Sequence, residues 1–194
     1  MTGAGRRGVP PGVALIRCRP AEARAQAAWL VEMEPWRGLG YRAAPLGRWL
    51  ARVARDQGVW VARGAKIPGA GRKAAGKPAG KAGGRPADVS GILVLETPVL
   101  LGGFISLLAV RTPATGQGLG RALVAHAERQ IFERDGKRWL YVSADAGNRA
   151  ALGFYRALRF ARVGRLPDLI RDGHTEVLLR KKRPPDRENR FRKT

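Results

Sequence analysis

The sequence predicts one mixed α/β domain in which a β-sheet is covered by helices. Apolar residues make up 44% of the 194 residues, enough for a packed core in a chain of single-domain length. Short apolar runs alternate with segments whose apolar residues recur at helical spacing. Two basic segments interrupt this pattern, and we place the folded domain at residues 13–180.

The first half of the chain is predicted to hold three strands and two helices. A strand at 14–19 precedes helices at 21–34 and 44–55. Residues 59–63 and 89–96 form two further apolar runs, one on each side of a basic segment. We therefore expect a hairpin whose turn has been expanded by that segment.

The second half begins with a near-continuous apolar strand at 103–110, a pattern that predicts burial on both faces. A helix at 118–134 follows, because Leu119, Leu123, Ala127 and Ile131 lie four residues apart and Gly136 is a stop signal. The remaining elements are a strand at 137–144, a helix at 148–158, and closing strands at 161–166 and 176–180.

Positive charge dominates the composition, with 37 basic against 15 acidic residues and a formal net charge of +22. Residues 64–87 are interpreted as a disordered basic insertion, because they cannot bury enough apolar surface to offset the entropy of ordering. Residues 1–12 are expected to be a flexible N-terminus, and residues 181–194 a basic tail. Such charge attracts phosphates, but abundant Arg, Ala, Gly and Pro also follow from GC-rich codons.

Several classes of protein are disfavoured by the composition. Cys18 is the only cysteine, so no internal disulfide and no cysteine-based metal cluster is expected, and a reducing cytoplasm fits best. The sequence contains no run of about 18 apolar residues, so no membrane span is expected. Residues 1–13 lack the apolar character of a signal segment.

A glycine-rich turn with the sequence TGQGLG at 115–120 lies between the apolar strand and the amphipathic helix. At such a turn, unpaired backbone N–H groups favour an anion, and glycines let a pyrophosphate approach closely. A dinucleotide fingerprint would need glycine where Arg121 stands, and residues 121–123 are not those of a nucleotide P-loop. An acyl-CoA loop and a turn without a ligand remain as interpretations of the turn itself.

Two stretches resemble the GNAT N-acetyltransferase superfamily. LLAVRTP at 107–113 followed by GQGLGRAL at 116–123 is similar to the family's cofactor motif, and NRAALGFYRALRF at 148–160 is similar to its second signature. The resemblance implies a mostly antiparallel twisted sheet of about six or seven strands with about four helices, and places the basic insertion in the hairpin between the second and third strands. It also implies direct transfer of an acetyl group from acetyl-CoA to a primary amine in a ternary complex.

The resemblance assigns roles residue by residue. It implies that the turn cradles the pyrophosphate, that the strand edge at 108–110 pairs with the pantetheine arm, and that Tyr155 protonates the leaving sulfur. A core aromatic is the other interpretation of Tyr155. No metal is implied. The implied cofactor-binding residues are Leu108, Ala109, Val110, Thr115, Gly116, Gln117, Gly118, Leu119, Gly120, Arg121 and Asn148.

The chain departs from the family pattern at two positions. Thr115 stands where the family usually has Arg or Gln, so we expect Arg111 or Arg121 to supply the missing charge. Arg159 stands where a glycine usually precedes the phenylalanine. If this position needs a positive φ to end the helix, arginine costs about 1 kcal/mol there.

The general base and the acceptor are not identified by the sequence. Ser106 lies where several relatives carry a carboxylate, and Glu32, Glu34 and Glu96 are further candidates. His126 is expected to be structural and His174 to be an exposed turn residue. The segment 32–41, with its aromatic and acidic side chains, is expected to choose the amine acceptor.

The competing hypothesis is a nucleic-acid-associated basic module with a vestigial acyltransferase core. The basic insertion and tail could each follow a phosphate backbone, but both lack interleaved aromatic residues apart from Phe191. We expect nonspecific nucleic acid binding through these segments as an additional property of an enzyme.

Overall fold

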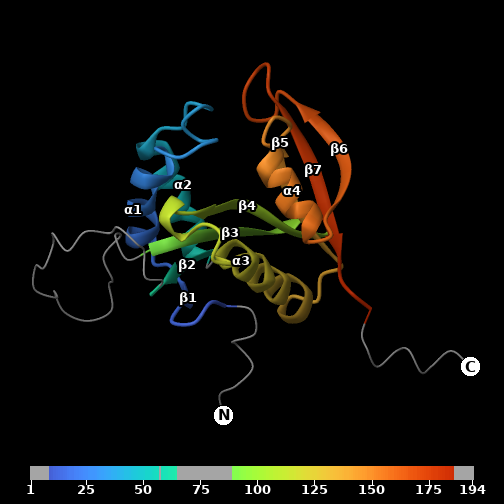
Figure 1. The fold of residues 1–194 in the computed structure, drawn as a ribbon, viewed down its shortest axis with the longest axis horizontal. Coiled ribbons are helices and arrows are strands. Elements are labelled where there is room, and N and C mark those ends of the chain that lie inside the picture. The colour runs from blue at the N-terminus through green and yellow to red at the C-terminus, as the bar shows by residue number, and fades with distance from the viewer. Residues whose placement is uncertain (1–8, 57, 65–88, 186–194) are drawn as a thin grey trace, which may run out of the picture. The chain divides into compact units, whose positions relative to one another are not determined.

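The computed structural model describes residues 9–56, 58–64 and 89–185 (Figure 1). The basic insertion, apart from Gly64, and the tail from residue 186 lie outside the described residues, as do residues 1–8. The disorder expected of the insertion and the flexibility expected of the N-terminus therefore stay predictions.

A seven-stranded sheet with strand order β1-β2-β3-β4-β5-β7-β6 organises the described residues. All the pairs for which a register is defined here, β1–β2, β2–β3, β5–β7 and β6–β7, are antiparallel. The expected mixed α/β fold, with a mostly antiparallel sheet and four α-helices in the described part, is confirmed. The strands are β1 (Ala14–Arg17), β2 (Val59–Arg63), β3 (Val89–Val99), β4 (Gly102–Val110), β5 (Trp139–Asp145), β6 (Ala161–Pro167) and β7 (Thr175–Lys182).

One compact unit comprises the described residues within Met1–Glu96 together with Ile105–Ala127. In it, α1 (Pro20–Leu30) and α2 (Ala43–Arg55) lie side by side (Figure 1). Their apolar faces, including Leu30 and Leu50, are fully buried in a core shared with strand residues such as Ile92. At about 25 cal/mol per Å² of apolar surface removed from water, this burial is the main stabilising contribution to the unit.

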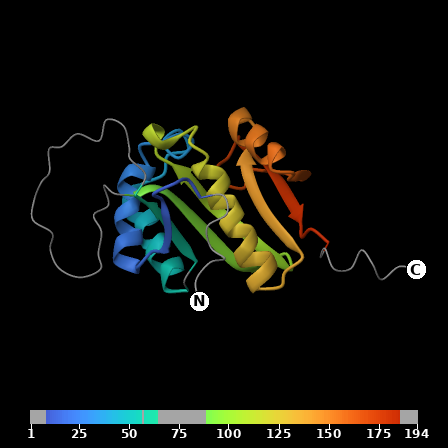
Figure 2. The ribbon, with the colours of Figure 1, turned by 60° about the horizontal axis from the view of Figure 1, so that its bottom comes forward.

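Helix α3 (Leu119–Glu128) crosses β3 in the same unit (Figure 2). Its close approach depends on Gly91 of β3, where an added Cβ would lie 3.2 Å from Leu123 Cδ1 and 3.4 Å from Leu119 Cδ2. Because Leu119 and Leu123 are both buried, the apolar stripe predicted from the sequence is the face that packs.

The second compact unit comprises Thr97–Phe104 and the described residues from Glu128 onward. It contains β5, the long β6–β7 hairpin and helix α4 (Arg149–Ala157), seen at the red end of the chain in Figure 1. The rings of Phe154 and Phe160 both pack edge-on against Tyr155. This arrangement contributes about 0.5–1.5 kcal/mol per pair beyond the area that is buried.

Three details of the sequence-based expectation are wrong. Helix α1 ends at Leu30 rather than at residue 34, because the chain from Val31 to Tyr41 forms tight turns such as Leu39 N–H to Pro35 O. The helix expected at 118–134 is regular only to Glu128 and continues as a π-helical segment (Arg129–Arg134).

The third detail concerns β4, whose side chains were expected to be buried on both faces. Ile105, Leu107 and Ala109 are buried, but the alternating residues Phe104, Ser106, Leu108 and Val110 are only half-buried. Continuous burial occurs instead on β3, from Val89 to Leu95. An apolar run therefore predicted a strand but did not distinguish a packed face from one that is partly open.

None of the helices in the described part of the chain is long and apolar enough to cross a membrane. Cys18 is buried, and burial raises the pKa of its thiol to about 12, although the positive charge of Arg63 acts in the opposite direction. The thiol therefore stays protonated and unreactive at neutral pH.

Candidate active site

The glycine-rich turn connects β4 to α3 through a short 3₁₀ turn (Thr112–Ala114). Gly116 and Gly118 adopt φ values of +76° and +80°. These values lie in the left-handed region, where a side chain costs about 1–2 kcal/mol. Helix α3 then begins with the hydrogen bond from Ala122 N–H to the carbonyl oxygen of Gly118, 3.0 Å in length.

Backbone N–H groups of this turn are available to a ligand. Across residues 116–121 of the described chain, no hydrogen bond to a protein acceptor satisfies an N–H group. No atom lies within 4 Å of the position that a Cβ would occupy at Gly116 or Gly118, so both glycines face open space. With the positive end of the α3 dipole, this arrangement is suited to an anion.

Two polar side chains of the turn are used to hold its shape. The Thr115 hydroxyl donates to the carbonyl oxygen of Thr112 at 2.7 Å, and Gln117 Nε2 donates to the carbonyl oxygen of Pro113 at 3.0 Å. Both side chains therefore stabilise the loop itself. Thr115 supplies no positive charge where the family usually has Arg or Gln.

Of the two arginines expected to replace the missing charge, the geometry favours Arg121. Arg111 Nε donates to the carbonyl oxygen of Val89 at 2.8 Å, and its guanidinium lies 4.5 Å from the centre of the Trp29 ring. Burial lowers the pKa of Arg111 below its ordinary value. Arg111 thus links β4 to β3 and α1, whereas Arg121 is exposed on the first turn of α3.

The strand edge expected to hold the pantetheine arm is the C-terminal end of β4. Ala109 is buried, while Leu108 and Val110 are half-buried on the partly open face. Ser106 lies two residues before Leu108, and alternation places both side chains on that face. The Ser106 hydroxyl donates to the carboxylate of Glu96 on β3. The structure thereby brings together two of the residues considered as bases.

Tyr155 lies in α4 and is 6% exposed. Its ring contacts Phe154 and Phe160 at centroid distances of 5.2 and 5.4 Å. Burial raises the pKa of Tyr155 above its ordinary value, so the side chain stays a neutral phenol at physiological pH.

The two ends of α4 explain two residues of the second signature. Asn148 is the N-cap, and its Oδ1 accepts the N–H of Ala151 at 3.0 Å. At the other end Arg159 has φ +65°, as expected from the glycine it replaces. Phe160 N–H donates to the carbonyl oxygen of Tyr155, which is the Schellman hydrogen bond that closes a helix.

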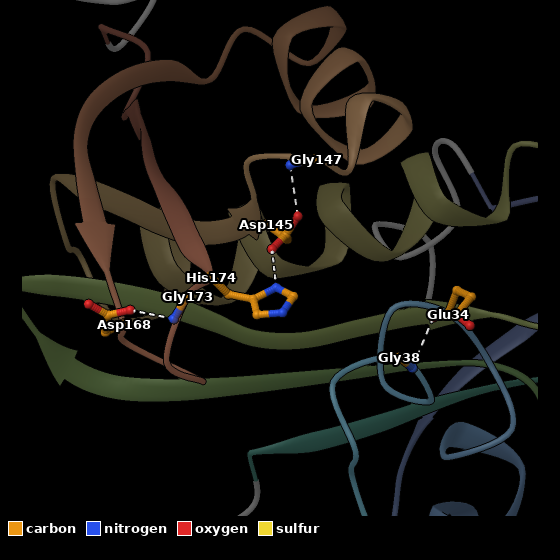
Figure 3. A network of polar contacts seen from close by, with 7 residues as sticks. All are labelled: Glu34, Gly38, Asp145, Gly147, Asp168, Gly173 and His174. Atoms are coloured by element: carbon orange, nitrogen blue, oxygen red, sulfur yellow. Dashed lines mark hydrogen bonds and ion pairs between the residues drawn. The ribbon is translucent and has the colours of Figure 1, made fainter.

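Of the remaining base candidates, His126 and Glu34 have structural partners. His126 packs edge-on against Trp60 with ring centroids 5.2 Å apart. Glu34 organises its own loop, because its carboxylate accepts the N–H of Gly38 at 3.1 Å (Figure 3). The same carboxylate pairs with Arg37. Glu32 is exposed.

A second polar cluster, formed by Asp145, His174 and Glu176, lies where β5 ends and β7 begins. It was not predicted from the sequence. Asp145 accepts the N–H of Gly147 at 2.7 Å and lies 3.3 Å from Nδ1 of His174 (Figure 3). His174 is therefore held in place, although its side chain is still 39% exposed. Glu176 pairs with Asp145 in the strand register and is 6% exposed.

The pKa of Glu176 is raised above its ordinary value, first by burial and further by the negative charge of Asp145. A hydrogen bond with Ser143 and the nearby His174 act in the opposite direction without cancelling this increase. The sequence holds one signal from which this cluster could have been predicted, namely the acidic Glu176 at the start of an apolar strand.

The model of the acetyltransferase (GNAT) family matches residues 25–160, which is more than two thirds of the chain. The chain belongs to the GNAT acetyltransferase family. The match covers the glycine turn, Tyr155 and both ends of α4. Acyl transfer is the general activity of this family, and membership does not specify the acceptor.

Solved structures of similar fold agree with this membership. Ard1 from Thermoplasma volcanium is 16% identical with a TM-score of 0.65, over 88% of this chain and 97% of that one. Arabidopsis thaliana NAA60, solved with a bisubstrate analogue, is 14% identical with a TM-score of 0.65 over the same shares. The NatC complex bound to Gag peptide and CoA is 18% identical with a TM-score of 0.60, over 88% and 98%. No curated protein sequence matches this one.

The residues expected to act in this GNAT protein belong to different compact units. The glycine turn, the edge of β4 and the Glu96–Ser106 pair are in the first unit, while Asn148, Tyr155 and the Asp145–His174–Glu176 cluster are in the second. The described residues contain no group of three or more His, Cys, Asp or Glu side chains arranged to hold a metal ion.

Proposed function

We propose that the protein transfers an acetyl group from acetyl-CoA to a primary amine by direct attack in a ternary complex. The observation that carries the proposal is the turn at 115–120. Two left-handed glycines there open unsatisfied N–H groups to solvent at the start of α3. Such donors suit a pyrophosphate, and the turn lies in the stretch that resembles the cofactor motif of the GNAT family.

In this proposal acetyl-CoA is held mainly by backbone groups. The N–H groups from Gly116 to Gly120 bind the pyrophosphate, and Arg121 adds the positive charge that Thr115 does not supply. The edge of β4 at Leu108–Val110 hydrogen-bonds the pantetheine arm. A backbone N–H of the same edge polarises the thioester carbonyl, which becomes more negative as the amine attacks.

Tyr155 is proposed as the acid that protonates the leaving sulfur. Its enclosed ring and raised pKa keep the hydroxyl protonated, so it can donate to a developing thiolate. Loss of the hydroxyl would leave the aromatic packing with Phe154 and Phe160 in place. The acid role and the packing role of Tyr155 can therefore be separated by experiment.

Glu96 is proposed as the general base, with Ser106 as its positioning residue. An alkyl amine with a pKa of about 10.4 is mostly protonated at neutral pH and must lose a proton before it attacks. The Ser106 hydroxyl binds the Glu96 carboxylate on the face of β4 that also carries Leu108. The carboxylate that relatives carry on the central strand is thus replaced by one from the neighbouring strand.

The acceptor is proposed to be a primary amine selected in part by the segment 32–41, which carries the Glu34 carboxylate and half-buried Trp36 and Tyr41. NatC was solved with a peptide, so peptide amines join small amines as candidates for assay. We expect the reaction to take place in a reducing cytoplasm, consistent with one buried, protonated thiol.

Calorimetry with acetyl-CoA, followed by CoA-thiol release with a panel of small amines and peptides, tests the proposal. We expect saturable binding in the micromolar range and amine-dependent thiol release. No heat of binding at millimolar acetyl-CoA would overturn it. Binding of acetyl-CoA without release for any amine would leave the cofactor site standing and contradict the proposed transfer.

A further inference from the structure

A groove of about 710 Å³ in the first unit is lined by residues of α1 and α2. Its lining includes Arg24 from α1 and Arg48, Arg52 and Arg55 from α2. Trp49 also lines it, and no acidic residue does. None of these residues belongs to the cofactor turn, to the edge of β4 or to the Glu96–Ser106 pair.

The four guanidinium groups of this arginine groove are exposed and lack acidic partners in the part of the chain that the structure describes. Arg48, Arg52 and Arg55 are spaced i, i+4 and i+7, so they lie on one face of α2. Four like charges along one groove repel each other, and that repulsion favours a bound anion.

Trp49 gives the groove an aromatic wall. The side chain is half-buried and packs against the core between α1, α2 and the sheet. Because it also lines the groove, part of its surface lies beside the arginines. A fixed aromatic side chain among cations is the arrangement on which an unpaired base stacks.

We propose that the arginine groove binds a single-stranded nucleic acid, with the arginines on its phosphates and Trp49 stacked on one of its bases. Arg48 and Arg55 are seven residues apart, or about 10 Å along the helix axis, which is more than one phosphate group spans. A concave surface suits a strand better than a flat lipid layer. None of the groove residues belongs to the proposed acyltransferase site, so nucleic acid binding at the groove is compatible with an active enzyme.

The main test compares two full-length variants that each lose four positive charges. In the groove variant Arg24, Arg48, Arg52 and Arg55 are replaced by Gln. In the control Arg149, Arg156, Arg162 and Arg165, which are exposed in the second unit, are replaced by Gln. Fluorescence anisotropy with labelled dT20 and U20 oligonucleotides is measured over a range of KCl concentrations without acetyl-CoA.

Four lost phosphate contacts should reduce the slope of log affinity against log salt by about 3 in the groove variant, since each contributes about 0.7 on a single strand. At about 0.15 M salt its affinity should fall at least tenfold, with a much smaller change in the control. Equal losses in the two variants would show that only net charge matters and would overturn the proposal. So would the absence of oligonucleotide binding by the unmodified protein.

Trp49→Leu tests the stacking and separates nucleic acid from other polyanions. Stacking is worth about 1–3 kcal/mol per base, so oligonucleotide affinity should fall about tenfold while heparin, which has no bases, binds as before. Equal loss for heparin would contradict base stacking. Trp49→Phe keeps an aromatic wall and should retain most of the affinity, which provides a readout if Trp49→Leu does not fold.

Two further measurements complete the design. Phosphatidylserine vesicles should not displace the oligonucleotide from the groove. If the unmodified protein and the control bind vesicles and the groove variant does not, the groove is a membrane-binding surface and the proposal is overturned. CoA-thiol release should be the same in the groove variant and the unmodified protein. Failure of the groove proposal and failure of the proposed enzyme activity are therefore distinguishable.

Discussion

The glycine turn at 115–120 and helix α4 carry the two signatures of the family in opposite ways. In the turn Gly116 and Gly118 face open space, and the side chains of Thr115 and Gln117 are bound to the backbone. In α4 the reverse holds, because Tyr155 is enclosed by aromatic rings. The turn is therefore expected to work through its backbone, and α4 through one side chain.

This difference separates binding from chemistry. A backbone site is disturbed by any substitution that changes φ, and the disturbance affects affinity for the ligand. A side-chain acid is removed by deleting one hydroxyl, and the loss affects the transition state more than the bound ground state. The predictions below test that separation, from the largest expected effect to the smallest.

Glu96→Gln should cause the largest loss, because without a base the amine stays protonated. Turnover in the CoA-release assay should fall by about 10³-fold, within the range for a positioned proton acceptor. Acetyl-CoA affinity, measured by calorimetry, should stay within about twofold, because Glu96 is proposed to act on the amine and not on the bound cofactor. Ser106→Ala, which keeps the carboxylate but not its hydrogen bond, should lose less activity than Glu96→Gln. A fully active Glu96→Gln protein would move the base to another residue.

Tyr155→Phe should lower turnover by about 10²-fold, at the low end for an acid because a thiolate is already a fair leaving group. The ring still packs between Phe154 and Phe160, so the thermal midpoint should change little. Acetyl-CoA affinity should be retained. Unchanged turnover would mean that Tyr155 is only a core aromatic, and the contrast between α4 and the turn would then fail.

Gly118→Val should weaken acetyl-CoA binding at least tenfold while the fold persists. The φ of +80° is strained for a β-branched residue, and the loop must change shape to relieve the strain. Gly153→Ala, at an α4 position where an added Cβ meets no atom within 4 Å, serves as the matched control. Calorimetry and a thermal melt measure the two effects. Full affinity in a folded Gly118→Val protein would place the cofactor elsewhere.

Glu176→Gln should have the smallest effect and should act on stability. The folded-state pKa of Glu176 is raised, so the folded protein binds more protons than the unfolded chain above pH about 4.5. Stability of the unmodified protein therefore falls as pH rises from there through the raised pKa. Glu176→Gln removes this dependence and should raise the thermal midpoint at pH 7 by about 1–4 °C.

The control for Glu176→Gln is a melt at about pH 3, where the carboxyl is protonated in both states and the two proteins should be alike. A midpoint that is lower for Glu176→Gln at pH 7 but the same at the acidic control would show that the carboxylate is stabilised in the folded protein. The direction of the pKa shift would then be wrong.

Local features of this protein were determined by the sequence alone. The periodicity of Leu119 and Leu123 predicted the buried face of α3, and both residues are buried. Arg159 stands where the resemblance has a glycine, which raised a positive φ as a condition, and φ is +65°. These features depend on residues a few positions apart, which share one helix turn or one pair of dihedral angles, so a local pattern is enough to specify them.

Contacts between distant elements were decided only by the tertiary structure. Glu96 meets Ser106 because β3 turns back as β4, and Asp145 lies opposite Glu176 because β5 pairs with β7 thirty-one residues later. The arginine groove exists because α1 packs beside α2. A charged residue has the same local pattern whether it ends in water or beside another charge. Strand register and helix packing decide between these outcomes, and both depend on burying the apolar faces of the whole sheet at once.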